Sequence, residues 1–281
     1  MKTTSFVVRT FCSLIMLSLL AGCVAPDFIS APPTSTPIPV PDGWDLIWHD
    51  EFDGNTIDSS NWTYDLGGGG WGNGEMQVYT DASENARLEN GLLVIEARKE
   101  ELENGGFQFT SARLKTQGLQ TFQYGRIEAR IKVPQGKGFW PAFWMLGENF
   151  PEVGWPDCGE IDIMEYVGRE PDLVIGTMHG PGYSGALGLS RWNRQNYNIA
   201  DDFHTFAIEW DANQISWFYD GEKFNTFTRE VVGDRSWPFD QPFFIILNFA
   251  IGGTLGGVVT PDTPFPAQYL VDYVRVYNKI P

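Results

Sequence analysis

The chain has 281 residues, a formal net charge of −17 and a pI of about 4.4. That length allows one large β domain or two small ones. The charge argues against a nucleic-acid partner, because phosphates must be neutralised by lysine and arginine. Aromatic residues make up 15% of the chain, with 11 tryptophans, which suits a large core together with exposed aromatic surfaces.

The first 22 residues have the pattern of an export signal. Lys2 and Arg9 precede an apolar run at 11–20 that is too short to span a membrane. The run ends in Leu-Ala-Gly-Cys23. This ending resembles a bacterial lipobox, which implies cleavage before Cys23 and attachment of lipid to it. The alternative is ordinary signal cleavage with an incidental cysteine.

Residues 23–41 form the next segment, with six prolines among Ser and Thr and almost no charge. This composition predicts an extended linker. A single folded domain is then expected at 42–281. We expect an exported protein, anchored to the bacterial cell envelope or cell surface, whose only membrane contact is the lipid on Cys23.

Cysteine usage in the expected domain excludes an internal disulfide, because Cys158 is the only cysteine at 42–281. A cysteine nucleophile is the functional alternative for Cys158. No basic residue adjoins it in the sequence, so a packed thiol is the preferred interpretation.

Strand patterns follow one another through this domain. In Arg126–Val133, apolar residues alternate with charged ones. Asp220-Gly221 lies between two alternating runs, which is a strong hairpin signal. No stretch has a long apolar stripe of helical period. We therefore predict an all-β fold, a two-sheet antiparallel β-sandwich.

The segment 155–168 carries the chemistry. It reads as a buried strand bounded by glycine, yet it contains Glu160, Asp162 and Glu165. Side chains alternate along a strand, so Glu160 and Asp162 share one face and Glu165 takes the other. A β-bulge near Ile163-Met164 would return Glu165 to the face of the other two acids.

Two carboxyl groups about 5–5.5 Å apart are what a retaining glycosidase requires. An unpaired buried charge is costly, so acids on such a strand need an explanation. Alternatively, the three acids form the polar outer face of an edge strand and have no catalytic role.

The same segment resembles glycoside hydrolase family 16 in its laminarinase branch, through its E-x-D-x-x-E spacing. The similarity runs from about Trp44 to Tyr277. It implies a β-jelly roll with a concave substrate cleft. The other segments that resemble the family are Trp48–Gly54, Gly72–Tyr79, Gly125–Arg130, Trp140–Leu146, Gly154–Gly159, Thr177–Gly180 and Asn248–Gly253.

The resemblance assigns roles at matching positions. It makes Glu160 the nucleophile, Glu165 the general acid and base, and Asp162 an orienting group between them. It also places His179 beside the catalytic acid. Further candidate substrate contacts, each with packing, strand pairing or a turn as the alternative role, are Asn73, Arg126, Trp140, Trp144, Trp155 and Asn248.

A structural calcium ion is a separate expectation, with no cofactor expected for catalysis. Alternation puts Asp272 on the inner row with Val274 and Val276, where a carboxylate needs a cation or several donors. By resemblance, the ligands would be Glu51, the carbonyl of Gly91 and Asp272. Ligation by oxygen alone suits Ca²⁺.

The expected function is an endo-acting retaining β-1,3-glucanase that cleaves laminarin-type glucan as a monomer, with mixed-linkage glucan as a second substrate. The E-x-D-x-x-E spacing argues against the strict mixed-linkage enzymes, which resemble E-x-D-x-E. Alternatives on the same fold are a hydrolase of agar or carrageenan, a transglycosylase, and a glucan-binding protein without activity.

Overall fold

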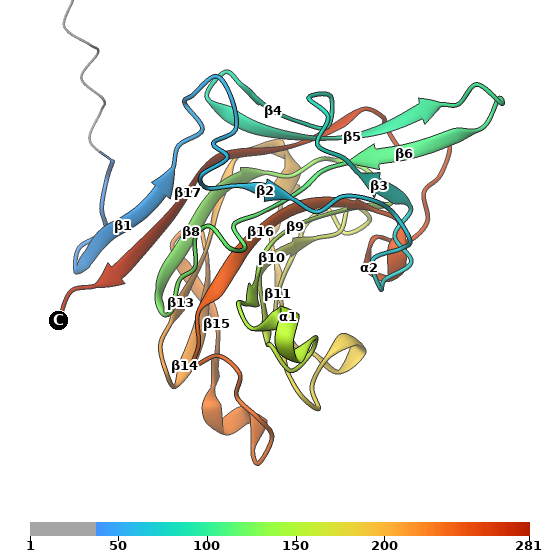
Figure 1. Ribbon diagram of the computed structural model, residues 1–281. Coiled ribbons are helices and arrows are strands. Elements are labelled where there is room, and N and C mark those ends of the chain that lie inside the picture. The colour runs from blue at the N-terminus through green and yellow to red at the C-terminus, as the bar shows by residue number, and fades with distance from the viewer. Residues whose placement is uncertain (1–37) are drawn as a thin grey trace, which may run out of the picture. The chain divides into compact units, whose positions relative to one another are not determined.

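The computed structural model describes residues 38–281 and is built on two β-sheets (Figure 1). The larger sheet has ten strands and the smaller has seven. The strands are β1 (Trp44–Asp50), β2 (Thr63–Tyr64), β3 (Gln77–Tyr79), β4 (Ala86–Glu89), β5 (Leu92–Glu101), β6 (Phe107–Ser111), β7 (Arg113–Lys115), β8 (Gly125–Lys132), β9 (Phe139–Gly147), β10 (Glu160–Tyr166), β11 (Leu173–His179), β12 (Leu189–Arg194), β13 (His204–Trp210), β14 (Gln214–Tyr219), β15 (Glu222–Thr228), β16 (Phe243–Ile251) and β17 (Ala267–Lys279).

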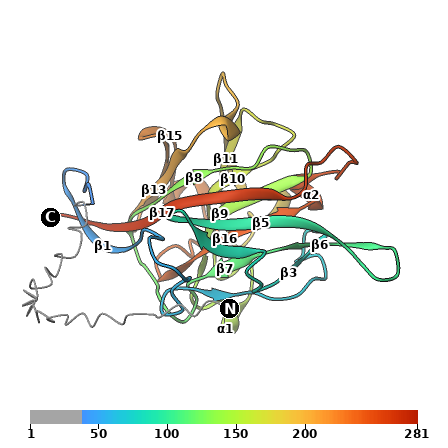
Figure 2. The same ribbon diagram turned by 90° about the horizontal axis from the view of Figure 1, so that it is seen from above.

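The strand order explains which elements surround the acids. The larger sheet runs β15-β14-β13-β8-β17-β5-β6-β3, with β1 on β17 and β4 on β5. The smaller sheet runs β12-β11-β10-β9-β16-β7-β2, so β10 lies near its middle and β12 at one edge. Seen from above, the two sheets lie one over the other (Figure 2). The predicted all-β sandwich is confirmed.

Helices are short and lie in the connections. They are α1 (Phe150–Val153) and α2 (Gly253–Gly256), with 3₁₀ turns η1 (Gly185–Leu187), η2 (Ile199–Asp201) and η3 (Arg229–Val232). Among the described residues, no helix is long and apolar enough to cross a membrane. The expected signal, Cys23 and the linker up to residue 37 lie outside the described residues.

The core fills the space between the two sheets. In β8, Ile127, Ala129 and Ile131 are fully buried, as their alternation predicts. In β10, Ile161 and Ile163 are buried in the same apolar cluster. Because neighbouring side chains in a strand point to opposite faces, the acids that flank these isoleucines point away from the core.

The inner position predicted for Asp272 is wrong. The pairing of β17 with β8 shifts register between Val271 and Tyr273, and this irregularity interrupts the alternation on which the prediction rested. The Asp272 side chain is 33% exposed, and it accepts a hydrogen bond from Arg130 at 2.8 Å.

Candidate active site

A β-bulge lies in β10 between the first two acids and the third. Against β11 the register shifts between Asp162 and Glu165, and against β9 it shifts between Asp162 and Met164. The extra residue restores Glu165 to the face of Glu160 and Asp162, as the spacing of the acids predicts. We call this face of the seven-stranded sheet, which points away from the core, the catalytic face.

Thr177 on β11 shows independently that the acids share a face. It pairs with Asp162 across the strands, so its side chain lies on the face of Asp162. Its hydroxyl also bonds to Glu165 Oε2 at 3.4 Å. Trp140 on β9 donates to the other oxygen of Glu165, Oε1, at 3.1 Å.

The backbone at the bulge is held from the opposite sheet. Trp217 on β14 is fully buried and donates its indole N–H to the carbonyl of Asp162 at 2.8 Å. Gly176 on β11 makes room for this ring, because a Cβ at that position would lie 2.5 Å from Trp217 Cδ1. A buried carbonyl at a bulge needs a partner, and Trp217 supplies it.

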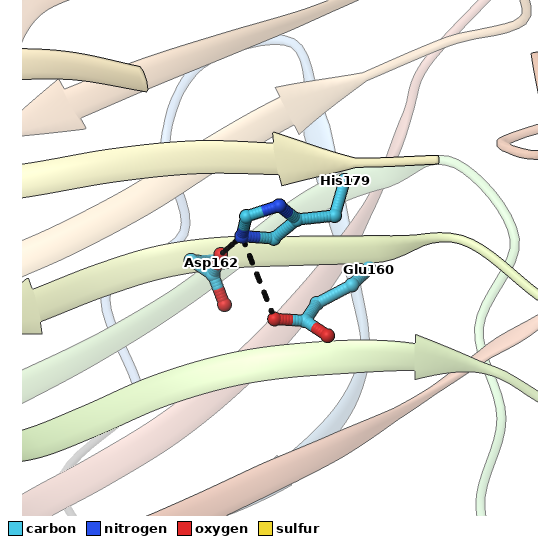
Figure 3. Close-up of side chains that lie close together, drawn as sticks. All are labelled: Glu160, Asp162 and His179. Carbon is cyan, nitrogen blue, oxygen red and sulfur yellow. Dashed lines mark ion pairs between the residues drawn. The ribbon is translucent and has the colours of Figure 1, made fainter. Parts of the chain in front are cut away.

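His179 lies between the first two acids. Its Nε2 is 3.2 Å from Asp162 Oδ2 and 3.8 Å from Glu160 Oε1 (Figure 3). Within residues 38–281, these three side chains form the one group of acids and histidines close enough to share a metal ion.

Burial raises the pKa of each of the three acids. The pKa of Glu160 rises to about 8, through burial and then through the neighbouring Asp162 carboxylate. The pKa of Glu165 rises to about 7, because burial outweighs the opposing effect of His179. Burial and the charge of Glu165 raise the pKa of Asp162 well above its usual range. The cluster therefore retains at least one proton at neutral pH.

A chain of hydrogen bonds joins three of the predicted substrate residues. Trp144 donates to Asn248 Oδ1 at 2.6 Å, and Asn248 donates to the Tyr79 hydroxyl at 3.0 Å. That hydroxyl donates to Glu75 Oε2 at 3.1 Å, and Asn73 donates to Glu75 Oε1 at 3.1 Å. Asn73, Trp144 and Asn248 thus lie on the side of the acids occupied by β16 and β7.

Arg113 on β7 belongs to the same region, and the sequence analysis missed it. Its guanidinium lies 4.7 Å from the ring centre of Trp144 and 5.1 Å from that of Trp71. It also pairs with Asp65 at 3.0 Å. Arg113 is identified by its pairing with Asn248 across β7 and β16. The sequence does not reveal this pairing.

Trp155 lies on the other side of the acids, in the loop before β10. The residue is 45% exposed and its ring centre is 6.1 Å from that of His179. An exposed indole beside the acids is available to contact substrate.

Arg126, by contrast, does not belong to the site. It lies on β8 of the ten-stranded sheet, opposite Glu209 on β13. Its guanidinium pairs with Glu128 at 2.6 Å and with Glu209 at 3.1 Å. The prediction that Arg126 contacts substrate is wrong, because alternation identifies the face of a strand but not the sheet to which it belongs.

The residues predicted to hold calcium lie near one another but have other partners. Glu51 follows β1, Gly91 turns between β4 and β5, and Asp272 lies on β17, which pairs with both β1 and β5. Both oxygens of Glu51 accept hydrogen bonds from Arg275, at 2.9 and 2.7 Å. The set fits a cation only if Arg275 releases Glu51 and Arg130 releases Asp272.

Cys158 has the environment of a packed thiol. Its side chain is fully buried, and its thiol donates to the carbonyl of Gly159 at 3.4 Å. Burial, with a further contribution from Glu160, raises the pKa of the thiol to about 11. A thiolate nucleophile is disfavoured under these conditions.

Two glutamates on the same face of one strand of a β-sandwich form the carboxylate pair that glycoside hydrolases use. The model of glycosyl hydrolases family 16 matches residues 73–274. The chain belongs to that family and is a retaining hydrolase.

Relatives of known activity or structure agree with this assignment. The chain is 49% identical to a β-glucanase of Rhodothermus marinus, over 84% of this chain and 85% of that protein. It is 49% identical to the endo-β-1,3-glucanase of Pyrococcus furiosus, with a TM-score of 0.80 over 84% of this chain and 95% of that structure. The laminarinase catalytic domain of Thermotoga maritima is 45% identical, with a TM-score of 0.80 over 85% of this chain and 100% of that domain.

Proposed function

We propose that the protein is an endo-acting β-1,3-glucanase of the laminarinase type, with mixed-linkage β-1,3-1,4-glucan as a second substrate. The observation that carries this proposal is the bulge in β10, which brings Glu160 and Glu165 to one face. The names of the relatives, a β-glucanase, an endo-β-1,3-glucanase and a laminarinase, support β-1,3-glucan as the substrate.

The first step is attack by Glu160 on the anomeric carbon, which forms a covalent glycosyl-enzyme. Glu160 must be ionised for this step. Because burial and the charge of Glu165 raise the pKa of Asp162 well above its usual range, Asp162 can take up the proton that Glu160 releases. A protonated Asp162 removes one negative charge and can donate a hydrogen bond to Glu160, which favours the ionised form of the nucleophile.

Glu165 acts as the general acid and then as the general base. It protonates the departing sugar oxygen in the first step and takes a proton from water in the second. A pKa of about 7 suits both directions, because a group with a pKa near ambient pH can donate and accept with similar ease. The bonds from Trp140 and Thr177 hold its carboxylate in place.

A neutral glucan fits the catalytic face better than a sulfated galactan. On β7, Arg113 and Lys115 both pair with Asp65, at 3.0 and 2.5 Å. On β12, Arg194 pairs with Glu170 and Asp172, each at 2.8 Å. These cations are already neutralised, so they offer little charge to a sulfate group.

A substrate panel tests the proposed function. Release of reducing sugar from laminarin, lichenan, agarose and carrageenan would be measured with the purified domain. We expect the highest kcat/KM on laminarin, lower activity on lichenan and none on the galactans. Activity confined to a galactan, or glucan binding with no hydrolysis at all, would contradict the proposal. Products longer than the starting sugar, when a short laminari-oligosaccharide is the substrate, would indicate transglycosylation.

Structural calcium remains part of the proposal. The ion would bind Glu51, the carbonyl of Gly91 and Asp272 and would stabilise the ten-stranded sheet, far from the chemistry. Oxygen donors of this kind suit Ca²⁺. Binding requires Glu51 to exchange Arg275, and Asp272 to exchange Arg130, for the ion.

We further propose that the enzyme is exported and anchored to the cell envelope by lipid on Cys23, and that it acts as a monomer. The sequence pattern at 1–23 supports the anchor. Labelling of cells with a radioactive fatty acid should mark the wild-type protein and not Cys23→Ser, and wild-type protein should be found in the membrane fraction. Equal labelling of both proteins would exclude Cys23 as the anchor.

A further inference from the structure

Trp192 is an exposed indole that the catalytic mechanism does not use. It lies on β12, the edge strand of the seven-stranded sheet, and its side chain is 62% exposed. A single exposed apolar residue is ordinary on a protein surface. The position of Trp192 in the sheet register is what distinguishes it.

The register places Trp192 on the catalytic face, in the same cross-strand row as Glu165. Glu165 on β10 pairs with Ile175 on β11, and Ile175 pairs with Trp192 on β12. Residues paired across neighbouring strands point to the same face. With strands spaced about 4.8 Å apart, the backbone of Trp192 lies roughly 10 Å from that of Glu165.

The neighbouring row confirms the orientation of β12. Ser190, two residues before Trp192, pairs with Thr177. The Thr177 hydroxyl lies 3.0 Å from that of Ser190 and 3.4 Å from Glu165 Oε2. Ser190 therefore points to the acids, and Trp192 shares its face because residues two apart in a strand point the same way.

Trp155 and Trp192 are both exposed indoles on the β12 side of the acids. The opposite side already has Trp71 and Trp144 around Arg113. An endo-acting enzyme must hold sugars on both sides of the bond it cleaves. Flat, apolar indole rings suit the faces of neutral pyranose rings. Arg194, the next residue of β12 on this face, is neutralised by Glu170 and Asp172, which also fits an uncharged ligand.

We infer that Trp192 is a sugar-binding platform on the β12 side of the acids. Its indole contacts a sugar unit of the glucan chain that lies further from the cleaved bond than the two units the bond joins. The inference rests on the proposed β-glucanase function and extends it. The occupant is another part of the same glucan chain, because the platform continues the face that carries the acids. The platform makes the enzyme favour long chains.

Steady-state kinetics on laminarin and on a series of laminari-oligosaccharides tests the inference. Trp192→Ala should raise KM for laminarin about three- to tenfold and leave kcat within twofold. The difference should disappear on oligosaccharides too short to reach β12. Trp192→Phe should retain most of the affinity, because a flat ring remains.

Arg191→Ala is the matched control. Arg191 precedes Trp192 on the same strand and pairs with Gly176, whose missing Cβ would point at the core residue Trp217. It therefore faces away from the acids, and its removal should leave KM unchanged. An unchanged KM for laminarin in Trp192→Ala, or an equal rise on the shortest cleaved oligosaccharide, would overturn the inference.

The failure of the proposed function has a different signature. In that case the wild-type enzyme itself would not cleave laminarin, whatever residue stands at 192. The comparison would then be made on the polysaccharide that the wild-type enzyme does cleave. A rise in KM confined to Trp192→Ala on its long chains would support the platform, and equal KM values would reject it.

Discussion

His179 tunes both catalytic glutamates. It lies between Asp162 and Glu160, and its charge lowers the pKa of Glu160 and of Glu165 against the stronger effect of burial. Burial nevertheless raises the pKa of Glu160 to about 8 and that of Glu165 to about 7, well above the ordinary value of a glutamate. The pH dependence of the reaction therefore depends on a residue that need not exchange a proton with the substrate.

We expect a bell-shaped pH profile of kcat/KM with both limbs in the neutral range. Substituting Asn for His179 removes the charge that lowers both pKa values, so both limbs should move to higher pH. The two limbs report values that belong to the interacting acids as a group. Limbs that stay in place or move to lower pH in the variant would contradict this role for His179.

At the scale of single elements, β10 depends on a residue from the other sheet. The spacing of the acids predicts the bulge, and the structure contains it. What the spacing cannot reveal is the donor that satisfies the bulged backbone, because Trp217 lies 55 residues further along the chain. The position of Glu165 thus depends on a contact across the core.

Trp217→Phe tests that dependence. A smaller aromatic ring remains but the indole N–H is lost, which leaves the buried carbonyl of Asp162 without its donor. We expect the free energy of unfolding to fall by about 1–3 kcal/mol. Loss of the bulge geometry should also lower kcat on laminarin.

Trp210→Phe is the matched control for this prediction. Trp210 is also buried, and its indole donates to a backbone carbonyl, that of Phe239, at 3.0 Å. This bond is made to the segment before β16 and not to the bulge in β10, so the variant should lose similar stability and keep its kcat. Equal kcat values in the two variants would show that Trp217 does not position the acids.

At the scale of the whole molecule, the alternation of apolar residues and the spacing of the acids predicted the fold class and part of the active site. They identified the β-sandwich and the inward residues of β8. They failed where the position of a side chain depends on long-range strand pairing. Arg126 belongs to the other sheet, and a register shift in β17 turns Asp272 outward. Register alone shows that Trp192 shares a row with Glu165, because β-pairing joins residues far apart in sequence.

The proposed calcium ion would contribute at this scale. At a free concentration 100 times its dissociation constant, an ion that binds only the folded state adds about 2.7 kcal/mol. For a domain of this size, EDTA should then lower Tm by roughly 5–10 °C. Asp272→Asn should abolish the effect of EDTA. An unchanged Tm of the wild-type protein in EDTA would show that the Arg130 and Arg275 ion pairs stand without a metal.

The most direct test of the account is chemical rescue of Glu160→Ala by azide. Removal of the nucleophile should abolish hydrolysis of an aryl β-laminaribioside, a substrate with a good leaving group. Azide, entering from the vacated side, should restore cleavage and give a glycosyl azide of inverted configuration. Glu165→Ala with azide should instead give the retained configuration, because Glu160 still forms the covalent intermediate. Absence of rescue in Glu160→Ala, or a retained product from it, would contradict the assignment of Glu160 as nucleophile and Glu165 as acid and base.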